Sequence, residues 1–506
     1  MSQTIAASKP AEFGKWRSFF WPVHQYELKK LLPMFLMFFF ISFVYSLLRN
    51  TKDALLVTAP GSSAEALVFL KVGGVVPAAI IFMLAYAKLS NLLSKEKLFY
   101  VTVSVFVAFF MLFAFVLYPA KEFLHPTELA DKLQASLPAG FAGLIATFRN
   151  WTYSLFYIFA ELWGSFILSL LFWGFANDTT KVTEAKRFYA LFGLGANLAL
   201  MAAGPVAKLI TRFDEGPEFI GGDPWQTPLN YLMGISIVSS LCVMGIYRWI
   251  NKNVLTDPKF YDQTEQVRVK KEKPKMSLKD SFIFLAKSRY VLCIAILVLT
   301  YNISINLLEI TWKSQLKLLY PGRSEYLDFM GTYSTILGAT TILMMLFVSS
   351  NVLRRFGWGV AAYITPVVLL ITGVGFFTFI IFKEPLAPLL VTWGVSPLVI
   401  AVLFGTIQNI MSKASKYSLF DPTKEMAYIP LDQESKVKGK AAIDTVGARL
   451  GKAGGSSIQL GLITVFGSLA AVTPHIAVIM LIIIGAWLWG VRQLDVLEFR
   501  KIENKK

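Results

Sequence analysis

Apolar runs about 20 residues long recur along the whole sequence. An α-helix of about that length crosses the hydrocarbon core of a bilayer, so each run predicts one membrane-spanning helix. The pattern predicts twelve spans, near residues 31-50, 66-87, 98-118, 150-176, 188-210, 229-250, 282-308, 327-350, 357-382, 386-411, 441-470 and 474-491. We therefore expect an all-α polytopic membrane protein.

A charged stretch from Asn251 to Asp280 separates the sixth run from the seventh. Six helices, a linker and six more helices are the outline of a secondary transporter made of two bundles. The predicted parts are an amino-terminal segment, a first six-helix bundle, a basic linker, a second six-helix bundle and a tail, at residues 1-30, 31-250, 251-280, 281-492 and 493-506.

Composition and charge agree with this pattern. Of the 506 residues, 55% are hydrophobic and only 16% are charged, which is too apolar for an ordinary soluble domain. The net charge is +17, and lysine and arginine cluster in the amino-terminal segment, the linker and the carboxyl tail. Because such clusters mark cytoplasmic segments of membrane proteins, we expect both termini to be cytoplasmic and infer no nucleic-acid partner.

Few residues are suited to metal or disulfide chemistry. Cys242 and Cys293 both lie inside apolar runs, and the chain has only three histidines, His24, His125 and His475. So few cysteines and histidines predict neither a disulfide framework nor a metal site, and no cofactor is expected. No nucleophile, acid–base pair or metal cluster is recognisable near one membrane face, so an enzyme is not expected.

Three charged residues end the first apolar run. Arg49, Lys52 and Asp53 are spaced at i, i+3 and i+4 on a pattern that continues as helix, so they project to one face. Charges in lipid cost several kcal/mol each, and we therefore expect this face to line a protein interior or a wet cavity.

Glu161 lies about 11 residues into the fourth predicted span, which places it roughly 17 Å along the helix and near the middle of the bilayer. No cation lies three or four residues away, so its partner must come from another helix, and Lys52 and Lys71 are candidates. Lys71, near the start of the second span, is also able to snorkel to the interface in a structural role.

Glu309 and Lys313 have the spacing of a favourable helical ion pair. Either they neutralise each other, or Glu309 lines a cavity near the end of the seventh span. The surrounding Leu307-Leu308-Glu309-Ile310-Thr311-Trp312-Lys313 echoes Leu47-Leu48-Arg49-Asn50-Thr51-Lys52-Asp53, which predicts that the two segments lie at one level in equivalent halves.

The eleventh predicted span holds Asp444, Arg449 and Lys452, with several small residues around the lysine. Together with Arg49 and Lys52, Lys452 would suit a polyphosphate, because phosphate oxygens require several cations or backbone donors. The stretch around Lys452 resembles a phosphate-binding loop only superficially, since the glycine spacing is one residue short and no strand precedes it.

Several segments together resemble the ATP/ADP translocase family of obligate intracellular bacteria and plant plastids. The motifs are Leu48-Arg49-Asn50-Thr51-Lys52-Asp53, Glu161-Leu162-Trp163-Gly164-Ser165, Phe172-Trp173-Gly174-Phe175-Ala176-Asn177, Leu308-Glu309-Ile310-Thr311-Trp312-Lys313 and, most specifically, Lys416-Tyr417-Ser418-Leu419-Phe420-Asp421-Pro422-Thr423-Lys424-Glu425 with its continuation to Asp444. The resemblance covers essentially the whole chain and is nearest to chlamydial nucleotide transporters.

The resemblance implies a major-facilitator-like fold in a bacterial inner membrane and import of host ATP in exchange for ADP, with phosphate accompanying ADP in some members. It also implies functional charges at Lys52, Glu161 and Glu309, and at a late lysine that is either Lys440 or Lys452. ATP and ADP are the expected substrates of a carrier that works as a monomer in the lipid bilayer.

The stretch beginning at Lys416 is predicted to be a cytoplasmic loop after the tenth span. A counterpart, Asn177 to Lys181, follows the fourth span. We interpret both as gates that close the cytoplasmic mouth, with candidate gating residues Asp178, Lys181, Lys416, Asp421, Lys424 and Lys440.

The leading hypothesis is a nucleotide antiporter working by alternating access, in which substrate phosphates replace internal ion pairs. The assigned substrate-binding residues are Arg49, Lys52, Glu161, Glu309, Lys313, Asp444, Arg449 and Lys452. The alternative is a proton-coupled net importer of nucleoside triphosphates, in which Glu161 or Glu309 titrates.

Overall fold

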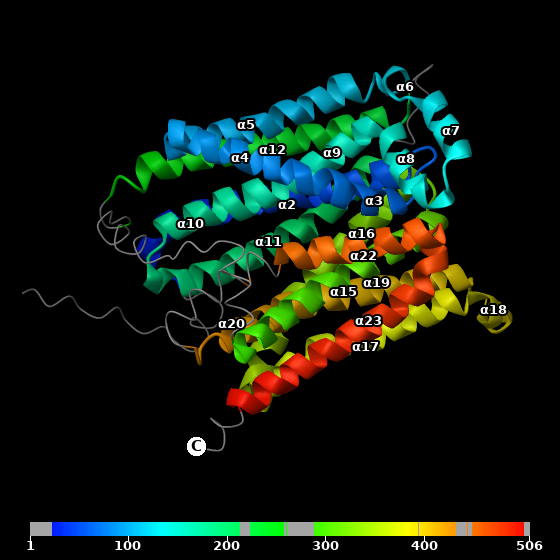
Figure 1. The fold of residues 1–506 in the computed structure, drawn as a ribbon. Coiled ribbons are helices and arrows are strands. Elements are labelled where there is room, and N and C mark those ends of the chain that lie inside the picture. The colour runs from blue at the N-terminus through cyan, green and yellow to red at the C-terminus, as the bar shows by residue number, and fades with distance from the viewer. Residues whose placement is uncertain are drawn as a thin grey trace, which may run out of the picture.

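The computed structural model describes residues 23–212, 223–257, 260, 288–392, 394–431, 443 and 448–499. Figure 1 shows long, roughly parallel helices in two groups, with the first half of the chain (residues 23–257) above and the second half (residues 288–499) below. Every regular element in the described ranges is helical. The all-α prediction is confirmed for these ranges.

Six long helical paths form the first half. They are α2 (Leu28–Val57), α3 with η2 and α4 (Glu65–Leu70, Lys71–Val75 and Val76–Leu92), α5 with η3 (Lys95–Leu112 and Phe113–Leu117), α9 with η5 and α10 (Trp151–Leu162, Trp163–Phe172 and Trp173–Thr179), α11 (Val182–Thr211) and α12 (Gln226–Asn253). A short η1 (Gln25–Glu27) precedes α2.

Six paths also form the second half. They are α15 (Arg289–Leu319), α16 with η7 (Arg323–Leu343 and Met344–Ser349), α17 (Ser350–Ile381), α19 with η8 and α20 (Pro397–Ser415, Lys416–Phe420 and Asp421–Ala427), α22 (Ala448–Phe466) and α23 with η10 (Leu469–Leu494 and Asp495–Phe499). In the described ranges eleven helices are long and apolar enough to cross a membrane. The shorter α22 occupies the place of the eleventh predicted span, so twelve paths match the prediction.

Two predicted boundaries near the tenth span are wrong. Residues 386-392 belong to a separate helix, α18 (Lys383–Thr392), and α19 begins only at Pro397, after a turn in which Gly394 has a φ of 70°. Proline is well suited to the first turn of a helix, which explains the start at Pro397. The stretch from Lys416 continues the helix as η8 and α20, although the sequence predicted a loop.

The bundle has two distinct ends. The terminal end is the one at which α2 begins and α23 finishes (Figure 1). The far end carries α18 and the short helices α6, α7, η4 and α8 (Lys121–Leu124, Thr127–Ser136, Ala139–Phe141 and Ala142–Arg149). The site described below lies toward the far end, between the two halves.

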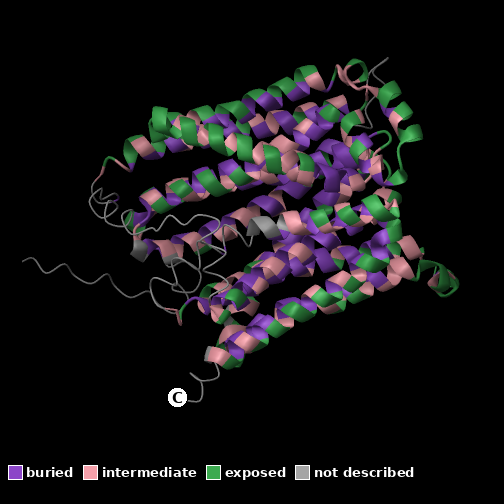
Figure 2. Cartoon of the chain, viewed as in Figure 1, coloured by how far each residue is buried: buried purple, intermediate pink, exposed green. Residues whose placement is uncertain are grey.

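Helices α2 and α15 are the most buried of the candidate spans, and each is the first long helix of its half. Figure 2 shows buried residues gathered along the middle of the molecule, while the outer helices expose much of their surface. Polar side chains on these helices find partners inside the protein: Asn50 on α2 donates to the hydroxyl of Ser334 on α16 at 2.9 Å. The two helices with the unusual charges are therefore enclosed by protein.

Glycine allows the halves to approach closely where α11 crosses α16. A Cβ atom added at Gly204 would collide with the Thr335 hydroxyl and the Gly331 carbonyl oxygen, and one added at Gly331 would lie 2.8 Å from the Gly204 carbonyl oxygen. One added at Gly338 would lie 2.7 Å from the Asn197 carbonyl oxygen. Small residues at such crossings let helix backbones pack in contact within a membrane.

We predict that Gly204→Ala lowers the melting temperature of the detergent-solubilised protein by several degrees, because backbone atoms on α16 must move to admit the methyl group. Gly234→Ala on α12 is the matched control, since nothing lies within 4 Å of its added Cβ. Alanine favours helix over glycine by about 1 kcal/mol, so the control should be neutral or stabilising. Equal melting temperatures for both variants would contradict this account of the crossing.

Candidate functional site

Six charged side chains of alternating sign form a continuous series, here called the ion-pair chain. Successive nitrogen–oxygen distances are 2.9 Å for Glu161–Lys52, 3.0 Å for Lys52–Asp53, 2.8 Å for Asp53–Lys313, 3.2 Å for Lys313–Glu309 and 3.2 Å for Glu309–Lys413. Three of its members come from the first half and three from the second. The chain therefore crosses the boundary between the halves through Asp53 and Lys313.

The centre of the ion-pair chain is sealed, whereas its ends are accessible. The side chains of Lys52, Asp53 and Lys313 are 2%, 1% and 3% exposed. Toward the two ends, Glu161, Glu309 and Lys413 are 29%, 20% and 12% exposed. A solute that enters between the halves therefore meets the ends of the chain before it meets the centre.

The local sequence explains how the first half presents its charges. Lys52 lies on the buried face of α2, and its ammonium lies 3.7 Å from the centre of the Tyr157 ring on α9. Cation–π contact of this kind stabilises a desolvated ammonium. Tyr157 precedes Glu161 by one helical turn, so the ring and the carboxylate reach Lys52 from the same face of α9.

Departures from regular α-helix occur at or near several charged residues, of which Glu161 belongs to the ion-pair chain. The path containing Glu161 becomes π-helical at Trp163, two residues later. Lys71 opens the π-helical η2, and Lys416 opens the π-helical η8. Such widened turns are frequent at functional sites because they re-aim side chains without ending the helix.

Two expectations about pairing are confirmed. Glu161 does take its partner from another helix, and that partner is Lys52. Glu309 and Lys313 form their i,i+4 ion pair at 3.2 Å, yet Lys313 also contacts Asp53 and Glu309 also contacts Lys413. The two charged segments also lie at one level, since Asp53 and Lys313 meet directly; that they are equivalent repeats stays a prediction.

Lys71 does not act as the sequence suggested. Its ammonium donates a hydrogen bond to the Asn306 side-chain oxygen on α15 at 2.9 Å, across the boundary between the halves. A snorkelling side chain would extend toward the membrane surface instead. Lys71 therefore adds a fourth cation beside the three lysines of the ion-pair chain.

Arg49 adds a fifth cation. Its guanidinium lies within electrostatic range of Glu309, Tyr45 and Tyr333. One of its terminal nitrogens, Nη2, is buried and makes no hydrogen bond to the described part of the chain. A buried donor of this kind is costly unless a ligand or water satisfies it, so Arg49 is well placed to bind an anion.

Sequence reasoning missed Lys413 and left Asp53 out of the assigned binding residues. Lys413 lies on α19 just beyond residue 411, where the predicted span ended, and the sequence analysis assigned it no role. In the structure α19 continues past it into η8, and Lys413 contacts Glu309 inside the bundle. The polar side chains of Gln408, Asn409 and Ser412 on the buried face of α19 were the signal available in the sequence.

The late residues assigned to the site are only partly covered by the structure. Asp444 and Lys440 lie outside the described residues, as do the side chains of Arg449 and Lys452, although the backbone of the latter two belongs to α22. Glycines of α22 face α15, because a Cβ at Gly451 would lie 2.6 Å from Cβ of Asn302. The small residues of α22 therefore allow its close approach to α15.

Apart from Lys440, which lies outside the described residues, the assigned gating residues lie toward the terminal end, and several make contacts within their own half. Lys416 contacts Asp421 at 2.8 Å, and Lys424 contacts Glu425 at 3.3 Å. The Lys181 backbone N–H donates to Glu184 at the start of α11 at 3.1 Å. These described contacts do not cross between the halves.

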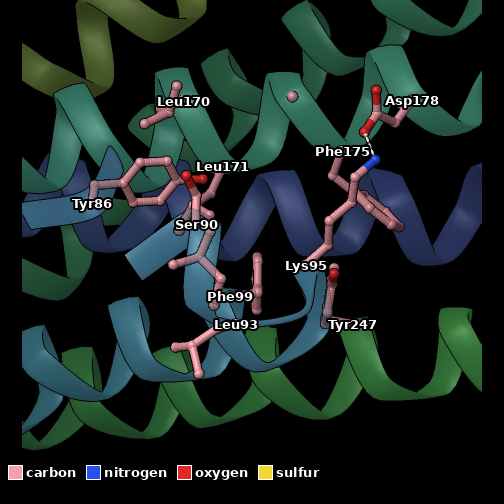
Figure 3. A pocket seen from close by; sticks show the side chains of 12 residues that line it. Tyr86, Ser90, Leu93, Lys95, Phe99, Leu170, Leu171, Phe175, Asp178 and Tyr247 are labelled. Atoms are coloured by element: carbon pink, nitrogen blue, oxygen red, sulfur yellow. Dashed lines mark hydrogen bonds and ion pairs between the residues drawn. The ribbon is translucent and has the colours of Figure 1, made fainter. Parts of the chain in front are cut away.

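Asp178 forms an ion pair with Lys95 at the edge of a pocket of the first half (Figure 3). Side chains of α4, α5, the α9–α10 path and α12 line this pocket, among them Tyr86, Ser90 and Tyr247. None of the residues of the ion-pair chain is among its lining residues. The pair fastens the start of α5 to the end of α10.

A second polar network closes the far end. Arg323 at the start of α16 donates to the Tyr118 hydroxyl at 2.7 Å and lies 5.0 Å from the centre of the Trp225 ring. The Tyr118 hydroxyl in turn donates to Asp223 at 2.6 Å, and Lys121 also contacts Asp223. Burial, with a contribution from nearby Arg323, lowers the pKa of Lys121 to about 8. The network joins the first half to the second.

Comparison with known proteins identifies one family of transporters. The model of the TLC ATP/ADP transporter family matches residues 6–497. The ADP,ATP carrier protein 1 of Chlamydia pneumoniae is 57% identical over 497 residues, which cover 97% of this chain and 95% of that protein. A chloroplastic ADP,ATP carrier protein 1 of Arabidopsis thaliana is 51% identical over 470 residues, covering 92% of this chain and 74% of the plant protein.

A solved structure supports the predicted fold. A bacterial homologue of the iron transporter ferroportin in an inward-facing state has a TM-score of 0.57 and covers 92% of this chain and 100% of its own, at 13% sequence identity. At that identity the likeness concerns the fold alone. It confirms a major-facilitator-like architecture, and the family match confirms the resemblance inferred from the motifs.

We predict that Lys52→Met destabilises the protein by about 3–5 kcal/mol, since it leaves Asp53 and Glu161 without a buried partner. Lys208→Met is the control, because the Lys208–Asp328 pair is about half exposed and such pairs are worth at most about 1 kcal/mol. Unfolding in mixed micelles measures both. A Lys52→Met variant as stable as the control would show that the ion-pair chain does not contribute to stability.

Proposed function

The chain belongs to the TLC ATP/ADP transporter family, and from this we propose that it imports ATP in exchange for ADP by alternating access. Curated relatives that match nearly the whole chain are named ADP,ATP carrier proteins. The membrane-spanning helices and the charged site between the halves are the apparatus that such exchange requires.

The excess of positive charge between the halves is the observation that carries this proposal. The described site holds five cations and three carboxylates, which leaves two positive charges: Arg49, Lys52, Lys71, Lys313 and Lys413 against Asp53, Glu161 and Glu309. A net positive site inside a membrane is costly without an anion. A nucleotide polyphosphate supplies the missing negative charge and several oxygens for lysine and arginine donors.

Exchange follows from the way the cations are held when no nucleotide is bound. Glu161 pairs with Lys52, and Glu309 pairs with both Lys313 and Lys413. Phosphate oxygens replace these carboxylates as partners of the accessible lysine Lys413, while Arg49 supplies its unused buried donor. An empty carrier retains its internal pairs and so reorients slowly, whereas a loaded one does not retain them.

The second half contributes further groups to this proposal. Lys452 on α22, with Asp444 and Arg449, completes the phosphate site in the late part of the chain, and Lys440 is the other candidate for the late lysine. The support for these residues is the motif resemblance and the position of α22 beside α15.

The orientation that we propose places both termini and the terminal end in the cytoplasm of a bacterial inner membrane. The clusters of lysine and arginine in the amino-terminal segment, the linker and the tail support this orientation. The pairs Lys95–Asp178 and Lys416–Asp421 then frame the cytoplasmic mouth, where Asp178, Lys181, Lys416, Asp421, Lys424 and Lys440 act as gate residues. The carrier functions as a monomer, and phosphate accompanies ADP outward.

We predict that proteoliposomes take up labelled ATP when they are preloaded with ADP and not when they are empty, because the empty carrier retains its ion pairs. A pH gradient should leave uptake unchanged, since protons would have to displace lysines from Glu161 and Glu309. Uptake into empty vesicles that grows with the proton gradient would establish the proton-coupled importer instead. Release of labelled phosphate together with ADP tests the accompanying ion.

We predict that Lys413→Gln reduces the exchange rate at least tenfold and raises the apparent KM for ATP, because an accessible cation of the site is lost. Lys383→Gln is the control, since Lys383 lies exposed on α18, outside the site. Matched expression and melting temperature exclude a folding defect. Normal exchange by Lys413→Gln would remove Lys413 from the binding site.

A further inference from the structure

Asp53 is the single residue through which the ion-pair chain passes from one half to the other. Its Oδ1 lies 3.0 Å from the Lys52 ammonium, and its Oδ2 lies 2.8 Å from the Lys313 ammonium. The Asp53 side chain is 1% exposed, so solvent neither screens nor replaces these contacts. Both carboxylate oxygens are engaged with cations from different halves.

Within the ion-pair chain, the Asp53–Lys313 contact is the one step that joins residues of different halves. Counted with Arg49 and Lys71, the described site residues of each half carry a net charge of +1, so this local pair and not the overall charge of the halves holds them together here. Because the pair is buried, its attraction acts with little screening.

Other described contacts between the halves run from the middle of the bundle to its far end. They include Asn50–Ser334 at 2.9 Å, Lys71–Asn306 at 2.9 Å, Arg323–Tyr118 at 2.7 Å and the Glu65 carboxylate with the Leu469 N–H at 2.7 Å. The far end is therefore closed in this structure. Asp53 and Lys313 provide the buried charge pair within that closed region.

We propose that Asp53 is the positioning residue that locks the far end of the empty carrier, and that a nucleotide polyphosphate bound to the second half's lysines releases this lock. The inference rests on the proposed nucleotide exchange. Phosphate that binds at Lys413 takes the place of Glu309, which in the empty carrier is shared between Lys413 and Lys313. The released Glu309 carboxylate then competes with Asp53 for the Lys313 ammonium, which weakens the contact between the halves.

This arrangement explains why transport is coupled to exchange. An empty carrier that faces the terminal end must break the Asp53–Lys313 contact to open its far end, and breaking a buried pair is strongly unfavourable. A loaded carrier has a weakened contact and opens. Asp53 acts through Lys313 and does not itself contact the nucleotide.

The first test is transport by Asp53→Asn, which removes the charge with little change of shape. We expect uptake of labelled ATP into empty proteoliposomes to rise several-fold above wild type, while exchange into ADP-loaded vesicles persists. The ratio of exchange to empty-vesicle uptake should therefore fall several-fold. An unchanged ratio would overturn the proposal.

Asp328→Asn is the matched control. Asp328 on α16 also pairs across the halves, with Lys208 on α11 at 3.5 Å, but both side chains are substantially exposed. Exposed pairs contribute little because solvent screens them. The ratio of exchange to empty-vesicle uptake should therefore equal that of wild type, and a fall as large as that of Asp53→Asn would assign the lock to interface charge in general.

A double variant addresses the case in which Asp53→Asn does not fold. The single change leaves the Lys313 ammonium buried without its Asp53 partner, which is its largest cost in stability. The double variant Asp53→Asn/Lys313→Gln avoids this cost because it removes both the carboxylate and the ammonium. Because Lys313 also belongs to the assigned substrate site, this variant is assessed by access to the far end, as in the second test below, and not by transport. We expect the far end to open as it does in Asp53→Asn, because the same contact is missing. A folded double variant whose far end stays closed would overturn the lock.

The second test measures opening of the far end without transport. Thr58 lies at the far end of α2, where its hydroxyl is 3.4 Å from Arg323 Nε across the halves. In a Cys242→Ser/Cys293→Ser background, Thr58→Cys reports access of a maleimide reagent in detergent. We expect slow labelling, accelerated several-fold by Asp53→Asn and by added ADP.

The two tests separate the lock from the proposed substrate. Faster labelling by Asp53→Asn without any nucleotide exchange by the wild type would retain the lock and reject nucleotides as the substrate. Wild-type exchange with labelling unaffected by Asp53→Asn would retain the proposed function and reject Asp53 as the lock. Labelling that ADP leaves unchanged would reject release by nucleotide.

Discussion

Charges buried in a membrane protein must be paired, and this constraint governs how the two halves meet. Each of the six side chains in the ion-pair chain would cost several kcal/mol if it were left alone in a low-dielectric interior. Alternating signs allow every member to have an opposite neighbour, and the series is complete only when Asp53 of the first half meets Lys313 of the second. The charges therefore specify the register of α2 against α15.

The same constraint makes the site responsive to an anion. Glu161 at one end and Glu309 and Lys413 at the other are the accessible members, while Lys52, Asp53 and Lys313 are sealed. An anion therefore changes the ion pairing at an end of the chain first. The change passes inward because each inner ion is shared between two neighbours, so an ion that loses one partner pairs more closely with the other. A carrier of nucleotides between compartments needs such a link between occupancy and shape.

Packing supplies the other half of the interface. Gly204 and Gly331 bring α11 and α16 into backbone contact, which fixes the helices around which the halves can rock. The polar network of Arg323, Tyr118 and Asp223 closes the far end through hydrogen bonds and aromatic contact. The few hydrogen bonds at the far end break more easily than the packed crossing of α11 and α16. The helix crossing is therefore the persistent contact between the halves, and the far-end network is the reversible one.

The sequence by itself determined the class of protein, the approximate place of its helices, and five of the charges that lie between the halves: Arg49, Lys52, Glu161, Glu309 and Lys313. Apolar length reports membrane crossing directly, and a charge such as Glu161 inside an apolar run is conspicuous because lipid excludes it. The ion pair of Glu309 and Lys313 could also be predicted, because residues four positions apart are neighbours on any α-helix. Motif resemblance added the family.

Only the tertiary structure decided which charges meet. Asp53 and Lys313 lie 260 positions apart, and no local period connects them. Lys413 was hidden because a helix that widens into a π-helical turn continues past the end of its apolar run. Lys71 was misread because its partner, Asn306, comes from the other half. Local physics fixes helices and their faces, whereas pairing between distant charges depends on how those faces pack.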